Sequence, residues 1–157
     1  MADSIQEQII KKLTVALAGI TVANGYENTI KTVQRYKASG VDLATTMPTI
    51  LVREGDCTPE PSVSPFGQVR RTQQVYLIIC VSHDELTDVR SGGEILNSFT
   101  ADIEKRLGVN PTWDGLAIMT RPPEYLEVQV EAETPHLARG LMTEIVYEHL
   151  RGDPFSQ

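Results

Sequence analysis

The sequence contains little cysteine and no long hydrophobic run. Its only cysteines, Cys57 and Cys80, are far apart in the chain and form no CxxC motif. Zinc sites and dithiol redox sites need closely spaced cysteines, so neither is expected. A reduced pair of thiols is the ordinary interpretation, and a structural disulfide is the alternative. No stretch approaches the roughly 18 apolar residues of a transmembrane helix, so we expect no membrane-spanning segment.

Positive charge and aromatic residues are also scarce. Acidic residues outnumber basic ones by 21 to 14, so the formal net charge is −7, and aromatic residues make up 6% of the chain. An acidic surface repels phosphate, so general binding to nucleic acids or to anionic membranes is not expected. The sequence has no basic stripe with interleaved aromatic residues on which nucleobases could stack.

Catalytic motifs are missing as well. His83-x-Glu85 has the first half of a zinc-deaminase pattern, but the Pro-Cys-x-x-Cys half is absent. The Ser-Gly-Gly run at 91–93 precedes a predicted helix, yet no P-loop lysine follows, so a plain helix N-terminus is expected. The other histidines, His136 and His149, form no metal-binding motif with His83. We therefore predict no enzyme activity, no metal site and no cofactor.

Periodic hydrophobic patterns predict two helices and six strands. Apolar residues recur every three or four positions in residues 4–19 and again in residues 92–107, which is typical of amphipathic helices. In the second helix, Asp102 and Arg106 have the spacing of an i,i+4 ion pair. Segments rich in β-branched residues, or alternating in polarity, predict strands at 29–37, 49–54, 71–82, 116–121, 125–133 and 141–151. The apolar run VYLIICV predicts that strand 71–82 is central.

Together these elements predict one domain over residues 1–157, since the length fits one domain and 41% of the residues are hydrophobic. We expect an α+β fold. Its sheet should be twisted, mostly antiparallel and of about five to six strands, with two amphipathic helices on one face. A long loop should join the second and third strands.

The most regular strand pattern lies near the end of the chain. Apolar and polar residues alternate without a break from 125 to 133, and the polar positions are Glu127, Gln129, Glu131 and Glu133. These four side chains should share one wet, acidic face of the sheet. Carboxylates two positions apart on a strand are about 7 Å apart, a separation compatible with the paired catalytic carboxylates of glycosidases. The sequence places no apolar residue beside these glutamates that could raise the pKa of one of them, as a general acid requires. A wet face or a polar interface is the preferred interpretation.

The expected loop at 55–70 contains several prolines and no periodic pattern. Loops of this length in compact domains are usually functional or disordered. One interpretation is a surface loop that folds its own apolar tips inward. The other is an arm that packs on a neighbouring subunit, for which the interface candidates are Arg53, Glu54, Asp56, Val63, Phe66, Val69, Arg70 and Arg71.

Four stretches of the chain together carry a family resemblance. They are the opening helix with IIKKLTVALAGI, the segment MPTILVREGD, the strand TQQVYLIICVS with the following ILNSFTADIEKRLG, and the closing EIVYEHLRGDPFSQ. In this order they resemble the tail terminator (tail completion, head–tail joining) proteins of long-tailed bacteriophages. The resemblance covers most of the chain as an order of elements.

The resemblance implies a structural protein of the virion, without a cofactor. Such a protein would form a homo-oligomeric ring, expected to be a hexamer, on the last ring of the tail tube protein. It would stop tail polymerisation and present a surface to the head connector and neck proteins. It would be assembled in the host cytoplasm and lie at the head-proximal end of the tail. DNA would pass through the ring without specific binding, and an acidic sheet face suits such a lumen because like charges repel.

Other interpretations stay open. A twisted sheet under two helices is also a common scaffold for a small-molecule or peptide-binding module, which would show a deep apolar pocket. Another neck or head–tail joining protein could share the same architecture. A hydrolase would have to use His83 or the row of polar residues from Glu127 to Glu133, and it is the least favoured interpretation.

Overall fold

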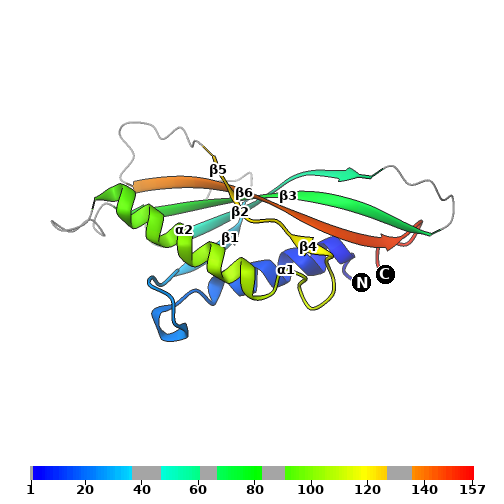
Figure 1. Ribbon diagram of the computed structural model, residues 1–157, viewed down its shortest axis with the longest axis horizontal. Coiled ribbons are helices and arrows are strands. Elements are labelled where there is room, and N and C mark those ends of the chain that lie inside the picture. Colours follow the sequence, from blue (N-terminus) through cyan, green and yellow to red (C-terminus); the bar gives the residue numbers. More distant parts are fainter. Residues whose placement is uncertain (1, 37–46, 61–66, 83–90, 127–135) are drawn as a thin grey trace.

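The computed structural model of the protein describes residues 2–36, 47–60, 67–82, 91–126 and 136–157. These residues form two α-helices and a six-stranded sheet that is mostly antiparallel and not closed, so the expected α+β fold is confirmed (Figure 1). The elements are α1 (Ile5–Ala18), β1 (Thr32–Arg35), β2 (Thr49–Pro59), β3 (Gln68–Ser82), α2 (Gly92–Val109), β4 (Met119–Thr120), β5 (Glu124–Leu126) and β6 (His136–Leu150). A short 3₁₀-helix, Val22–Asn24, follows α1.

Two long antiparallel strands form the centre of the sheet. β3 and β6 have 15 residues each and pair from Gln68 opposite Leu150 to Ser82 opposite His136. The strand order is β1-β2-β3-β6-β4, with β5 also paired to β6. β1 runs parallel to β2, and the other pairings between described strands are antiparallel. β3 is therefore central, as its apolar run predicted.

Both helices start at serine caps. In α1 the hydroxyl of Ser4 accepts a hydrogen bond of 3.2 Å from the backbone N–H of Glu7. In α2 Ser91 and Glu94 form a capping box, in which each side chain accepts from the backbone N–H of the other residue. The Ser-Gly-Gly run is thus a helix N-terminus, as expected. α2 continues to Val109, slightly beyond its predicted end.

The two helices pack on the same face of the sheet and enclose one hydrophobic core. Alternate residues of β2, β3 and β6 face the apolar stripes of the helices, since side chains on a strand have a period of two. The core includes Ile9, Leu13, Leu17, Ile50, Val52, Leu77, Ile79, Phe99, Ile103, Leu141 and Ile145. Burying each such side chain stabilises the fold by about 1.5–3 kcal/mol. On the opposite face Leu51, Cys80 and Val146 are also buried, outside this cluster.

The connection between β2 and β3 is much shorter than the sequence predicted. β2 continues to Pro59 and β3 already begins at Gln68, so half of the expected loop at 55–70 is strand. The register shifts between Glu54 and Cys57, and pairing with β3 then resumes. A bulge of this kind absorbs extra residues without ending a strand. Cys57 therefore lies in β2 and not in a loop.

Gly55 is one reason why this part of the sequence was predicted to be a loop. Position 55 requires glycine because β2 and β3 approach each other closely there. A Cβ at this position would lie 2.4 Å from ring atom Cε2 of Tyr76. Glycine inside a strand often marks a bulge or such an approach. The interface candidates Val63 and Phe66 lie outside the described residues.

Several other predicted boundaries differ from the structure. The strands expected at 29–37 and 116–121 are reduced to β1 and to the two residues of β4, whereas β6 begins at His136, before its predicted start at 141. Of the alternating strand, the structure describes β5 as far as Leu126. The four polar positions, Glu127, Gln129, Glu131 and Glu133, lie outside the described residues.

Candidate functional site

The predicted interface residues do not form one cluster, because neighbouring residues of a strand point to opposite faces. Arg70 lies on the face away from the helices, with its guanidinium 2.8 Å from the carboxylate of Glu148 and 3.8 Å from that of Glu60. Arg71 lies on the helix-covered face, where its Nε–H donates to Nε2 of His149 at 2.9 Å. The structure thus divides two adjacent candidates between two surfaces.

The remaining described candidates have different environments. Arg53 is exposed, with its guanidinium 5.7 Å from the centroid of the Tyr36 ring, in a cation–π contact. Asp56 is exposed beside the bulge, and Val69 is partly buried. Glu54 is partly buried and belongs to a polar network under α1.

This network joins the first turns of α1 to the sheet. The amide of Gln6 donates to Oε1 of Gln73 at 2.7 Å, and its carbonyl accepts from the Tyr147 hydroxyl at 3.4 Å. Gln73 is 2% exposed, so its pairing replaces the water that it loses on folding.

The same network includes charged groups. Arg35 of β1 contacts Glu7 of α1 at 2.8 Å and also forms an ion pair with Glu54 of β2. The Gln6 amide lies 3.4 Å from the second oxygen of Glu54, which connects the charged and uncharged parts. Helix α1 is therefore fixed to four strands, β1, β2, β3 and β6, by polar contacts as well as by its apolar stripe.

A cleft of about 470 Å³ adjoins the network where β3 and β6 meet the start of α1 and the end of the chain. We call it the Arg71 cleft, and its lining is Ser4, Gln6, Cys57, Arg71, Tyr147, His149, Gly152 and Pro154. The N- and C-terminal segments lie together here (Figure 1), and the N–H of Ile5 donates to the carbonyl of Pro154 at 3.0 Å. The Cys57 sulfur lies 3.5 Å from the Tyr147 hydroxyl. Burial, together with this thiol, raises the pKa of Tyr147, so the phenol stays protonated at neutral pH.

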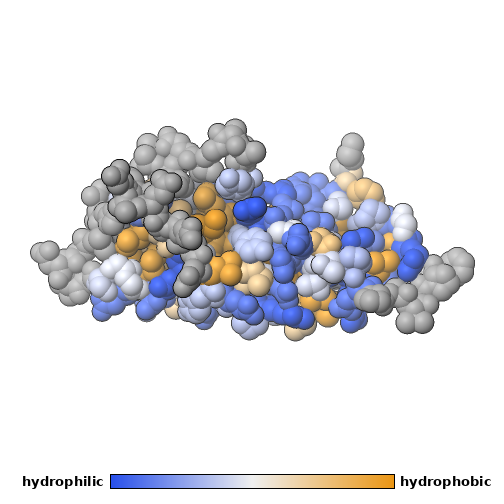
Figure 2. Space-filling model, turned by 90° about the horizontal axis from the view of Figure 1, so that it is seen from above, coloured by the Kyte–Doolittle hydropathy of each residue, from blue (hydrophilic) through white to orange (hydrophobic). Residues whose placement is uncertain are grey.

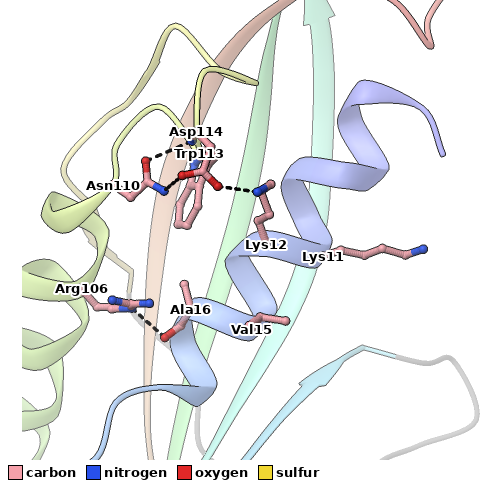
Figure 3. A pocket seen from close by; sticks show the side chains of 8 residues that line it. All are labelled: Lys11, Lys12, Val15, Ala16, Arg106, Asn110, Trp113 and Asp114. Atoms are coloured by element: carbon pink, nitrogen blue, oxygen red, sulfur yellow. Dashed lines mark hydrogen bonds and ion pairs between the residues drawn. The ribbon is translucent and has the colours of Figure 1, made fainter. Parts of the chain in front are cut away.

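A second, smaller hollow of about 330 Å³ lies between α1 and the turn after α2 (Figure 3). Lys12 points toward Asp114 and pairs with it, whereas Lys11 points away. The Nε–H of Arg106 donates to the carbonyl of Ala16 at 2.8 Å. Each of these cations has a partner on this chain, since Lys11 pairs with Asp3, so the hollow is a packed junction between elements.

The turn beside that hollow has unusual backbone geometry. Trp113 and Asp114 have φ values of 51° and 60°, in the left-handed region that non-glycine residues rarely adopt. Asn110 holds the turn by two hydrogen bonds with Asp114, of 2.9 and 3.1 Å. The Trp113 indole N–H donates to the Thr120 hydroxyl at 2.8 Å, and the ring is buried. Trp113 thus anchors this turn in the hydrophobic core.

The described surface is mixed in character. Figure 2 shows hydrophilic residues over much of one side, with hydrophobic residues in separate patches between them. The exposed apolar residues include Ile118, Met119, Tyr125, Leu126, Leu150 and Phe155. Among the described residues no group of three or more His, Cys, Asp or Glu could hold a metal ion, and no described helix is long and apolar enough to cross a membrane. Cys57 and Cys80 are both free thiols.

Sequence reasoning missed most members of the polar network. Gln6 and Arg35 lie in segments that read as an ordinary helix surface and a polar strand, and nothing local distinguishes them. Gln73 could have been detected in the sequence, because it is a polar residue on the face of β3 that Val75 and Leu77 make apolar. A polar residue at a buried position of a strand predicts a hydrogen-bonded partner across the core.

Comparison with known proteins finds no matching family and no curated protein with detectable similarity to this sequence.

Proposed function

We propose that this protein is a structural assembly protein of a long-tailed bacteriophage. It forms a ring at the head-proximal end of the tail tube, stops tail polymerisation and joins the tail to the head connector. The observation that carries this proposal is the element order α1-β1-β2-β3-α2-β4-β5-β6, because the family resemblance rests on an order of helices and strands and the fold has that order. One fold can serve many unrelated functions, so assembly with tail tubes is the property to measure.

The surface of the sheet provides supporting features for contacts between subunits. The end of the β2–β3 hairpin and the adjoining end of β6 bear charges of both signs on the face away from the helices, including Arg70, Glu60 and Glu148. Closed rings use heterologous contacts, in which one surface of a subunit meets a different surface of the next. Mixed charges at such a surface favour one orientation over others.

The experiment is assembly of the purified protein with isolated tail tubes. Mass photometry should detect an oligomer whose mass is a multiple of 17.4 kDa, and electron microscopy should show rings at one end of each tube. Added before tube polymerisation, the protein should limit tube length. A strict monomer that binds no tube end would contradict the proposal.

One observation favours a second candidate function. The Arg71 cleft has the volume of a small-molecule site, since such sites occupy about 300–1,000 Å³. A binding module would show ligand-induced thermal stabilisation and no tube capping. A neck protein of similar architecture would instead bind the connector and leave tube length unchanged.

A further inference from the structure

The Arg71 cleft contains a cation whose charge is not neutralised by any described residue. Arg71 donates its Nε–H to Nε2 of His149, so that ring nitrogen accepts and the imidazole is neutral. The imidazole proton is then on Nδ1, which lies 2.8 Å from the carbonyl oxygen of Leu150. Within the described part of the chain no Asp or Glu forms an ion pair with Arg71. His149 therefore orients the guanidinium without compensating its charge.

Three arginines differ from Arg71, whereas Arg53, Arg106, Arg139 and Arg151, like Arg71, form no ion pair in the described part of the chain. Arg35, Arg70 and Arg121 each form an ion pair with at least one glutamate. Arg71 keeps both Nη groups without a hydrogen-bond partner among the described residues, although it is only partly exposed. The structure leaves no buried side-chain nitrogen unpaired in its described part, so these groups face the open cleft.

We propose that the Arg71 cleft binds a carboxylate group, presented by a free dicarboxylic acid or by an acidic side chain of a protein segment. Two parallel N–H groups of a guanidinium match the two oxygens of a carboxylate. The group that enters the cleft differs in charge between a carboxylate and a phosphate. A carboxylate carries one negative charge, and the second carboxylate of a dicarboxylic acid or peptide can stay in solvent. A phosphate places up to two charges on one group, and a protein with a net charge of −7 repels that group more strongly. This binding is a property of the folded subunit and does not depend on the proposed ring.

The cleft contains its own reporter. Cys57 is a partly buried free thiol in the lining, so a bound ligand should shield it from a small alkylating reagent. Cys80 should stay silent in the same experiment, because it is 2% exposed and burial raises its pKa to about 11. The rate of Cys57 alkylation by iodoacetamide therefore measures occupancy of the cleft.

The test titrates glutarate, and separately the peptide acetyl-Ala-Glu-Glu-Ala-amide, at constant ionic strength. We expect a saturable slowing of Cys57 alkylation of at least threefold, with half-saturation in roughly the millimolar range that one such ion pair supports. Slowing by the peptide alone identifies a protein segment as the occupant, and slowing by glutarate as well identifies free dicarboxylates. Slowing by neither would overturn the proposal, and so would an equal or stronger effect of inorganic phosphate.

Two variants of neighbouring residues separate binding from general charge effects. Arg71→Gln should abolish the slowing, whereas Arg70→Gln removes the same charge from the adjacent position on the opposite face and should leave it unchanged. Arg71→Lys keeps the positive charge but lacks the planar guanidinium, so the ligand concentration that gives half-maximal slowing should rise several-fold. Circular dichroism checks that each variant is folded. Undiminished slowing in a folded Arg71→Gln or Arg71→Lys protein would refute the site.

Discussion

The carboxylate of Asp102 in α2 accepts a hydrogen bond of 2.8 Å from the backbone N–H of Asn28, in the connection between α1 and β1. Its other oxygen accepts from the backbone N–H of Glu27 at 3.1 Å, and the Asn28 side-chain amide adds a third bond of 2.8 Å. Asp102 is 4% exposed, so these bonds form away from water. One side chain of α2 thus satisfies two backbone donors and holds the α1–β1 connection in place.

Replacing Asp102 by alanine should lower the free energy of unfolding by about 1–3 kcal/mol, because it removes the acceptor of two backbone N–H groups, those of Glu27 and Asn28, at a partly buried junction. Urea denaturation followed by circular dichroism measures the change. The matched control is Glu104→Ala, an exposed position on the same helix, which should change stability by less than about 0.5 kcal/mol. Similar losses in both variants would show that the Asp102 bonds contribute nothing specific.

Gly55→Ala should destabilise the protein by about 1–3 kcal/mol, because the new methyl group overlaps the Tyr76 ring and forces it to move. The cost should be relieved when Tyr76 is already alanine. A double-mutant cycle measures this coupling as the difference between the two backgrounds. If Gly55→Ala costs the same with and without the ring, the close approach of Gly55 to Tyr76 is not what requires glycine.

The buried thiol of Cys80 predicts a loss of stability at alkaline pH. Burial raises its pKa from 9.0 to about 11, so between these values the unfolded chain releases the thiol proton while the folded chain keeps it. The unfolded state then binds fewer protons, and stability falls as pH rises. The contribution is complete below pH 9 and is lost by about pH 11, and it amounts to up to about 3 kcal/mol.

Urea denaturation between pH 8 and 11 tests this prediction. Wild type and Cys80→Ala should lose stability in parallel from their other titrating groups, and wild type should show an additional loss that the variant lacks. If the two pH profiles have the same slope, then Cys80 does not titrate at different pH values in the folded and unfolded chains.

Both helices were predictable because their signals are local. The apolar stripe of α1 contains Ile5, Ile9, Leu13 and Leu17 at successive helical turns, and all four are buried. Ser4 and Ser91 cap the helices through bonds to residues three positions away. Interactions within four residues are visible in a sequence without knowledge of the fold.

Predictions failed where a distant partner determines a residue's role. Asp102 and Arg106 have the spacing of an ion pair on the helix surface, but Asp102 binds the 27–28 backbone and Arg106 binds the carbonyl of Ala16. Each of these two side chains binds the backbone of a distant segment, and the fold decides which backbone groups lie within its reach. A buried backbone N–H without an acceptor costs more than an exposed ion pair contributes.

The candidate site was predictable only in part. The sequence identified Arg71 and Arg70 as interface candidates, but it could not assign them to opposite surfaces while residues 55–70 were expected to be a loop. His149, which orients Arg71, is 78 positions away in the sequence. Its assignment requires the β3–β6 register, in which Arg71 pairs with Tyr147.

The sequence by itself determined the α+β class, the order of helices and strands, and the apolar faces that form the core, since the period of hydrophobic residues reflects local backbone geometry. Only the tertiary structure decided that β2 continues through a bulge to Pro59, and that Gln6, Gln73 and Tyr147 form one network. It also decided that Arg71 faces an open cleft beside a neutral histidine. These features depend on strand register and on pairings between distant segments, and a shift of one residue would turn each side chain to the other face of the sheet.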